Sequence, residues 1–149
     1  AEEQTSAGDM LDVDQVFAQF KKGVEEQIGL EDSDTHFDLG IAYREMGLFE
    51  DAVRELEVVL RTGARMIEAL SLLASCRLAL GDPTAAAAHL EAALARAGDS
   101  DEAMVALRYD LGEALLAAGR DAEAREAFSK VAAIDPGFRD VAERLARFG

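Results

Sequence analysis

A motif that recurs at a fixed spacing constrains the fold of this chain more than any other feature. Each copy has a leucine, a small residue directly after it, a glycine eight residues after the leucine, and then an alanine and a large apolar residue. The second copy follows the first by 34 residues at every position, and the third follows the second by 38. The matched residues are Leu39, Gly40, Gly47, Ala52 and Leu56, then Leu73, Ala74, Gly81, Ala86 and Leu90, then Leu111, Gly112, Gly119, Ala124 and Phe128. Such a period predicts stacked supersecondary units, an architecture that presents a long surface to a partner.

Helical periodicity places two antiparallel helices in each copy of the motif. We expect helices near 34–46, 49–61, 66–80, 83–96, 101–118 and 121–133. Gly47, Gly81 and Gly119 each lie where a tight turn must join two helices, because glycine adopts the left-handed conformation without steric cost. Asp82 followed by Pro83 is a favourable start for the fourth of these helices.

The segments outside the repeats have distinct patterns. Residues 1–10 are acidic and aperiodic, which predicts a disordered leader. Within 11–30 an apolar residue recurs every three or four positions, which predicts an amphipathic helix. Its apolar residues are Val13, Val16, Phe17, Phe20, Val24 and Ile28. We expect repeat units at 33–66, 67–100 and 101–138 and a capping segment at 138–149. The capping segment contains a closing helix, roughly 137–148, with an apolar stripe of Val141, Leu145 and Phe148.

Composition excludes several classes of partner. The 149 residues carry a net charge of −15, which repels nucleic acids and anionic lipid surfaces and attracts basic protein surfaces. No apolar run is long enough to span a membrane. The single Cys76 rules out an internal disulfide and fits a reducing, cytoplasmic compartment. Because the chain begins with Ala1 rather than Met, we expect it to be a piece of a longer protein.

No residue pattern indicates catalysis, a cofactor or a metal. His36 and His89 belong to different repeats with no converging ligands, so we expect both to be surface residues. Cys76 occupies the place of Ala42 and Ala114 in the other repeats, which indicates a small core residue. No catalytic triad, phosphate-binding loop or paired-carboxylate motif is recognisable, so the sequence does not predict an enzyme.

The repeated residues resemble those of the tetratricopeptide repeat (TPR) family over about 33–149. This resemblance implies an all-α, right-handed superhelix of three repeats between an N-terminal helix and a C-terminal capping helix. Two stretches, 20–24 and 35–48, also look like terminal modules of large bacterial TPR scaffolds. That narrower resemblance implies a cytoplasmic assembly protein that organises cell polarity or surface motility.

The resemblance and helical geometry together select a binding surface. If Leu39, Leu73 and Leu111 point into the core, the residues two before and two after them line the concave face of the first helices. With one further turn, the predicted contacts are Phe37, Ile41, Arg44, Ser71, Ser75, Leu78, Tyr109 and Glu113. Phe37 and Tyr109 are the predicted aromatic anchors, with ordinary packing between repeats as the alternative. The family's carboxylate clamp would retain only Arg44, so we do not expect capture of a free C-terminus.

The predicted function is a protein–protein interaction module, a scaffold or adaptor. Its partner would present an apolar helix or surface patch flanked by Lys or Arg. The alternative is a secretion chaperone of the same family that guards apolar segments of exported proteins. The sequence does not distinguish these two roles, and it does not predict an oligomeric state.

Overall fold

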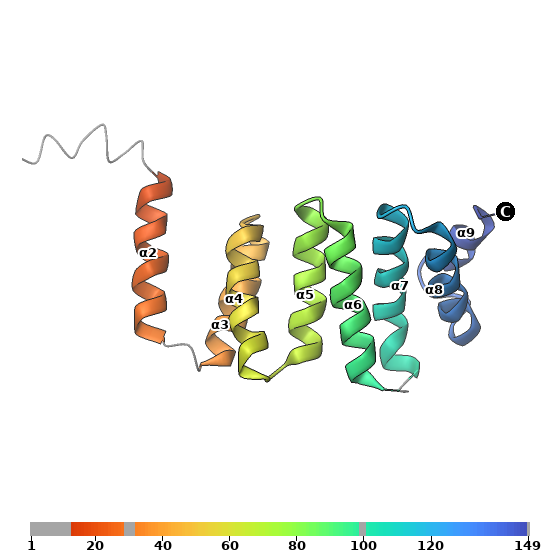
Figure 1. The fold of residues 1–149 in the computed structure, drawn as a ribbon, viewed down its shortest axis with the longest axis horizontal. Coiled ribbons are helices and arrows are strands. Elements are labelled where there is room, and N and C mark those ends of the chain that lie inside the picture. The colour runs from red at the N-terminus through yellow and green to blue at the C-terminus, as the bar shows by residue number, and fades with distance from the viewer. Residues whose placement is uncertain (1–12, 29–31, 99–100, 149) are drawn as a thin grey trace, which may run out of the picture.

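The protein is described by a computed structural model over residues 13–28, 32–98 and 101–148. Within these ranges every regular element is an α-helix. The helices are α2 (Val13–Ile28), the pair α3 (Ser33–Glu45) and α4 (Phe49–Thr62), the pair α5 (Met66–Ala79) and α6 (Pro83–Ala97), the pair α7 (Asp101–Ala117) and α8 (Asp121–Ile134), and α9 (Val141–Ala146). Figure 1 shows them side by side in one row. The all-helical repeat fold is therefore confirmed, and the six paired helices begin and end within one residue of the predicted bounds.

The same tight turn joins the two helices of each pair. Gly47, Gly81 and Gly119 have φ values of 79°, 80° and 78°, the left-handed conformation predicted for them. In each turn the residue after the glycine donates its backbone N–H to the carbonyl five residues earlier. These donor–acceptor pairs are Leu48 to Tyr43, Asp82 to Arg77 and Arg120 to Leu115, at 2.8, 2.8 and 2.9 Å. The bond satisfies a carbonyl that the helix end leaves unpaired, so all three pairs share one turn geometry.

Small residues allow the two helices of a pair to approach closely. A Cβ atom added to Gly40 would lie 2.8 Å from the side chain of Leu56, and one added to Gly112 would lie 2.6 Å from the ring of Phe128. On the facing helices, the repeated alanines are fully buried; they are Ala52, Ala86 and Ala124. The close-contact role predicted for these small residues is confirmed.

Replacing Ala86 with leucine should lower the free energy of unfolding by about 1–3 kcal/mol, because a closely packed helix contact has no room for the extra carbons. Urea denaturation followed by circular dichroism measures this cost. Ala88 is an exposed position on the same helix and provides the matched control. Ala88→Leu should change the free energy by less than about 0.5 kcal/mol. Equal losses of stability for Ala86→Leu and Ala88→Leu would show that Ala86 does not lie on the side of α6 that packs against the core.

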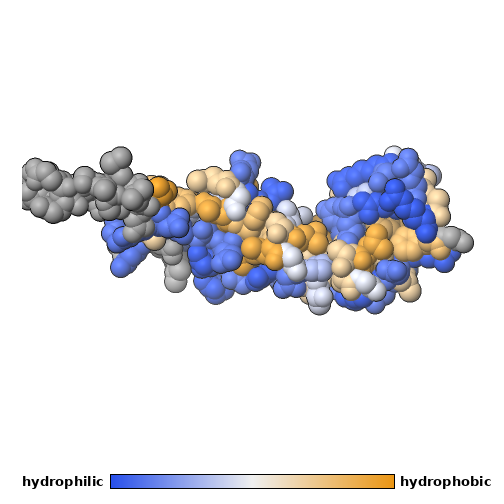
Figure 2. Space-filling view, turned by 90° about the horizontal axis from the view of Figure 1, so that it is seen from above, coloured by the Kyte–Doolittle hydropathy of each residue, from blue (hydrophilic) through white to orange (hydrophobic). Residues whose placement is uncertain are grey.

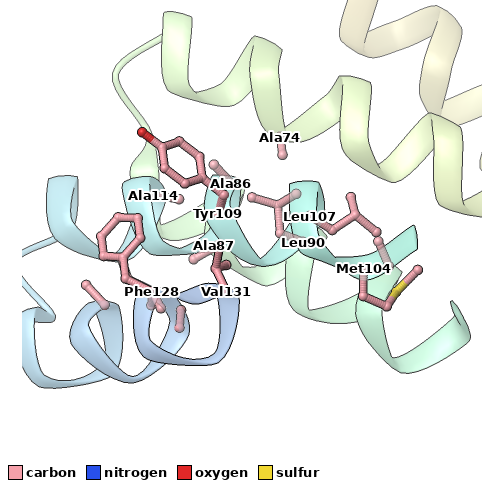
Figure 3. Close-up of a cluster of buried hydrophobic side chains, with 14 of the residues drawn as sticks. Ala74, Ala86, Ala87, Leu90, Met104, Leu107, Tyr109, Ala114, Phe128 and Val131 are labelled. Carbon is pink, nitrogen blue, oxygen red and sulfur yellow. The ribbon is translucent and has the colours of Figure 1, made fainter. Parts of the chain in front are cut away.

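Buried apolar side chains form two clusters along the stack. The first fills α3 and α4 and reaches α5 through Leu73 and Cys76. The second extends from α5 to α9, and Figure 3 shows its members from successive helices converging around Tyr109 and Phe128. Cys76 is fully buried, as predicted for a small core residue, and burial raises the pKa of its thiol.

The C-terminal end differs from the prediction. The closing helix, predicted to begin at 137, begins only at Val141, because Arg139 adopts a φ of 45° that an α-helix cannot contain. Its apolar stripe is confirmed, since Val141 is fully buried and both Leu145 and Phe148 pack against the second cluster.

At the N-terminal end, α2 contacts the first pair only in part. The ring of Phe17 lies edge-on to Tyr43, with centroids 6.0 Å apart, and Lys21 forms an ion pair with Asp51 of α4. The rest of the described apolar stripe of α2 is exposed, at Val13, Val16 and Phe20. The predicted leader, 1–10, lies outside the described residues. No helix in the described ranges has the length and apolar content required to cross a bilayer.

Candidate interaction surface

The first helices of the pairs are α3, α5 and α7, and α3 contacts α5 directly. Between α3 and α5, the Nε of Arg44 donates a hydrogen bond to Oγ of Ser75 at 3.0 Å. Beyond α7, the guanidinium of Arg144 in α9 donates to Oε2 of Glu113 at 2.6 Å. We call the surface formed by α3, α5 and α7 the first-helix face. It carries all eight predicted contact residues.

The two predicted aromatic anchors are buried in this face. Phe37 is 7% exposed and Tyr109 is 4% exposed, so neither ring is presented to a partner. The guanidinium carbon of Arg65 lies 4.6 Å from the ring centroid of Phe37, and that of Arg139 lies 4.9 Å from the centroid of Tyr109. The prediction of exposed anchors is therefore corrected, and the alternative of packing between repeats describes both rings.

These two arginines have matching environments. Arg65 directly precedes α5 and Arg139 lies two residues before α9, and both have positive φ values, 50° and 45°. Each also forms an ion pair with a carboxylate on the helix that carries the aromatic ring. Arg65 is 3.3 Å from Asp34, and Arg139 is 3.2 Å from Asp110. Stacking and pairing together attach each linker to the preceding first helix.

A polar network joins α9 to α7 around Tyr109. The Tyr109 hydroxyl donates a hydrogen bond to the carboxylate of Asp140. Arg144 donates to the same carboxylate at 3.3 Å as well as to Glu113. Burial and the bond to Asp140 raise the pKa of Tyr109 to about 12, and the same bond lowers the pKa of Asp140. Tyr109 and Glu113 therefore hold the C-terminal helix in place.

Stability should fall in alkali because of Tyr109. An unfolded tyrosine loses its proton near pH 10, whereas the folded Tyr109 retains it until about pH 12. Between these values the folded state binds more protons, so the free energy of unfolding decreases as the pH rises and is unaffected below this window. Urea denaturation at several pH values from 9 to 12 should show a steeper loss for the native protein than for Tyr109→Phe. If the free energy of unfolding fell equally with pH in both proteins, Tyr109 would not be the cause of the loss.

The open part of the first-helix face lies on α3 and α5. Of the predicted contacts on these helices, Phe37 is buried and Leu78 is exposed. The remaining four are partly exposed; they are Ile41, Arg44, Ser71 and Ser75. This open part combines two aliphatic side chains with hydroxyls and one guanidinium.

The histidines differ from the prediction. His36 is 2% exposed, not a surface residue, and its Nδ1 lies 2.8 Å from Oε1 of Glu55, which is 5% exposed. A single sequence gives no sign of this pair, since the two residues lie on different helices. His89 is partly buried, which lowers its pKa, and the nearby Arg77 lowers it further. Across the described ranges, no three His, Cys, Asp or Glu side chains are grouped to hold a metal ion.

Comparisons with known proteins agree with this geometry. Two models of the tetratricopeptide repeat match the chain, over residues 37–103 and 77–148. No curated protein sequence matches it. A crystal structure of MamA is 26% identical with a TM-score of 0.69, and the match covers 77% of this chain and 65% of that one. The chain thus spans 65% of the length of that relative.

Two further structures share the fold. A second crystal structure of a MamA protein is 23% identical, with a TM-score of 0.68 and coverage of 97% of this chain and 74% of the other. The NMR structure of the first TPR domain of human RPAP3 is 16% identical, with a TM-score of 0.66 and coverage of 80% and 91%. At these identities the similarity concerns the helical architecture alone.

Proposed function

This chain belongs to the tetratricopeptide repeat family, and we propose that it binds another protein through its first-helix face. Repeats of this kind form protein–protein interaction modules, in which stacked helices present an extended surface. The observation that carries the proposal is the alignment of the first helices. The bond from Arg44 to Ser75 joins equivalent faces of α3 and α5, so side chains from two repeats form one continuous surface.

The proposed contacts are the open residues of this surface. Ile41 and Leu78 offer aliphatic contact, and Ser71 and Ser75 offer hydroxyls that can bond with a polypeptide backbone. We expect the partner to present an apolar patch or helix beside Lys or Arg, because a chain of net charge −15 attracts basic groups over a distance.

The burial of Phe37 and Tyr109 favours a scaffold or adaptor over a chaperone. A chaperone for apolar segments requires broad apolar contact, and the rings of Phe37 and Tyr109 are buried, so they are not available for it. A cytoplasmic location is compatible with the buried free thiol of Cys76 and remains part of the proposal.

Site-specific photocrosslinking tests the surface. A photoreactive residue at Ser75 should capture a protein in cells of the native host, whereas one at exposed Ala88 of α6 should not. The double variant Ile41→Glu/Leu78→Glu should lose that capture and still unfold cooperatively. Equal capture from Ser75 and Ala88, or full capture by the double variant, would place the binding surface elsewhere.

A further inference from the structure

One edge of the stack exposes apolar side chains at the turns of the first two helix pairs. Met46 is 61% exposed in the first turn, and Leu80, its equivalent in the second, is 37% exposed. The third turn has Ala118 at this position, followed by the polar Arg120 and Asp121. Figure 2 looks onto this edge and shows hydrophobic surface running along the middle of the molecule between hydrophilic areas. We call the exposed surface of the first two turns the turn edge.

The turn edge is hollowed as well as apolar. Two adjoining cavities of about 240 and 410 Å³ share Glu50 and Leu80 as lining residues. The first cavity also contacts Leu48 and Phe49. Cavities of this size are at the small end of ligand-binding pockets and can receive side chains of a partner.

Carboxylates surround this apolar surface without being neutralised. Glu45, Glu50 and Asp82 are exposed, and none of them has an ion-pair partner among the described residues. Asp51 is different, since it pairs with Lys21 of α2 and is largely covered. Arg54 also lines the larger cavity, but its charge is paired with Asp51. The charges left unpaired around the apolar centre are therefore negative.

A second polar group faces the larger cavity. Arg77 lines it, and its Nε atom is buried without a hydrogen-bond partner in the described structure. Its guanidinium also pairs with Glu57, 3.9 Å away, so it does not neutralise the rim carboxylates.

We propose that the turn edge is a second protein-docking surface, which receives an apolar side chain flanked by Lys or Arg from a partner polypeptide. The charge complementarity selects this occupant. Anionic lipid would be repelled by the rim carboxylates, and a second copy of this chain would bring its own net charge of −15. The turn edge includes none of the contacts proposed for the first-helix face, so this inference goes beyond the proposed function.

Methyl NMR on methionine-labelled protein tests the location. The probe is a short amidated peptide with two leucines between pairs of lysines. Met46 reports on the turn edge, and Met104, which is 4% exposed, serves as a buried reference. The Met46 methyl signal should shift as the peptide is added, while the Met104 signal stays in place. An unmoved Met46 signal would overturn the proposal. A Met46 shift that depends on protein concentration without peptide would assign the surface to a second copy instead.

Fluorescence anisotropy with the labelled peptide tests the chemistry. Leu80→Ser should weaken binding at least fivefold, and Glu50→Gln should weaken it about threefold. Ala118→Ser, at the equivalent position of the third turn, and Ala88→Ser, at an exposed position on α6, should leave the affinity unchanged. A peptide with glutamates in place of the lysines should bind at least tenfold more weakly. Equal binding of the two peptides, or equal losses for Leu80→Ser and Ala118→Ser, would refute docking at this edge.

Discussion

Replacing Phe128 with alanine should lower the free energy of unfolding by about 3–5 kcal/mol, the range for removing a large buried aromatic side chain. Phe128 is fully buried, and its ring centroid lies 5.5 Å from that of Tyr109 and 6.3 Å from that of Phe148. The ring therefore contacts α7 and the C-terminal turn at once. Urea denaturation with cooperative unfolding in both proteins measures the loss.

A second substitution makes this test specific. In the native protein Gly112→Ala should be destabilising, because the new Cβ would lie 2.6 Å from the Phe128 ring. In the Phe128→Ala background that space is free, and alanine should then stabilise the helix by up to about 1 kcal/mol relative to glycine. The sign of the Gly112→Ala effect should thus reverse. If the two free-energy changes simply add, the cost of Gly112→Ala does not arise from contact with the Phe128 ring.

Gly23 of α2 provides the control for this cycle. No atom lies within 4 Å of a Cβ added there, so Gly23→Ala should not reduce stability in the intact protein. A loss at Gly23 comparable to that at Gly112 would mean that the cost of alanine is unrelated to close helix contact.

The helix pairs could be predicted because each of their determinants occurs three times in the sequence. The turn glycines and the buried alanines stand at one spacing, so a single local geometry explains all copies. A contact between a small residue and a large one, such as Gly40 with Leu56, depends only on residues within one repeat. Local periodicity is sufficient for such contacts.

The candidate site was harder to predict because it depends on neighbouring units. The register argument assumed that all three repeat leucines point into the core, but only Leu73 is fully buried, and Leu39 and Leu111 are partly exposed. The positions two residues before the leucines therefore lie nearer to the junctions between units. An aromatic ring at such a position is covered when an arginine of the next linker stacks on it. Periodicity within one helix does not show that contact.

Some of these links do have a sequence signal. Arg44 and Ser75 are 31 residues apart, and so are Glu113 and Arg144. A separation of 31 is the 34-residue period less about one helical turn, so it connects residues on two helices that are one period apart. Pairs of polar residues at this spacing indicate which side chains form hydrogen bonds between helices and are therefore not free to bind a partner.

Replacing His36 with leucine should lower the free energy of unfolding by about 1–3 kcal/mol, the cost of leaving a buried polar group without its hydrogen-bond partner. The repeat pattern makes this change look conservative, since Leu70 holds the equivalent position in the second pair. The cost arises because the carboxylate of Glu55, 2.8 Å from Nδ1 of His36, would remain buried without that partner.

The double variant His36→Leu/Glu55→Met should regain most of this loss, because an apolar pair of similar volume leaves no polar group unpaired. Denaturation of the two single variants and the double variant gives the coupling energy directly. If the losses simply added, the two side chains would act independently. If they cancel, the His36–Glu55 pair contributes little net stability, and the cost of each single change comes from the partner that it leaves unpaired.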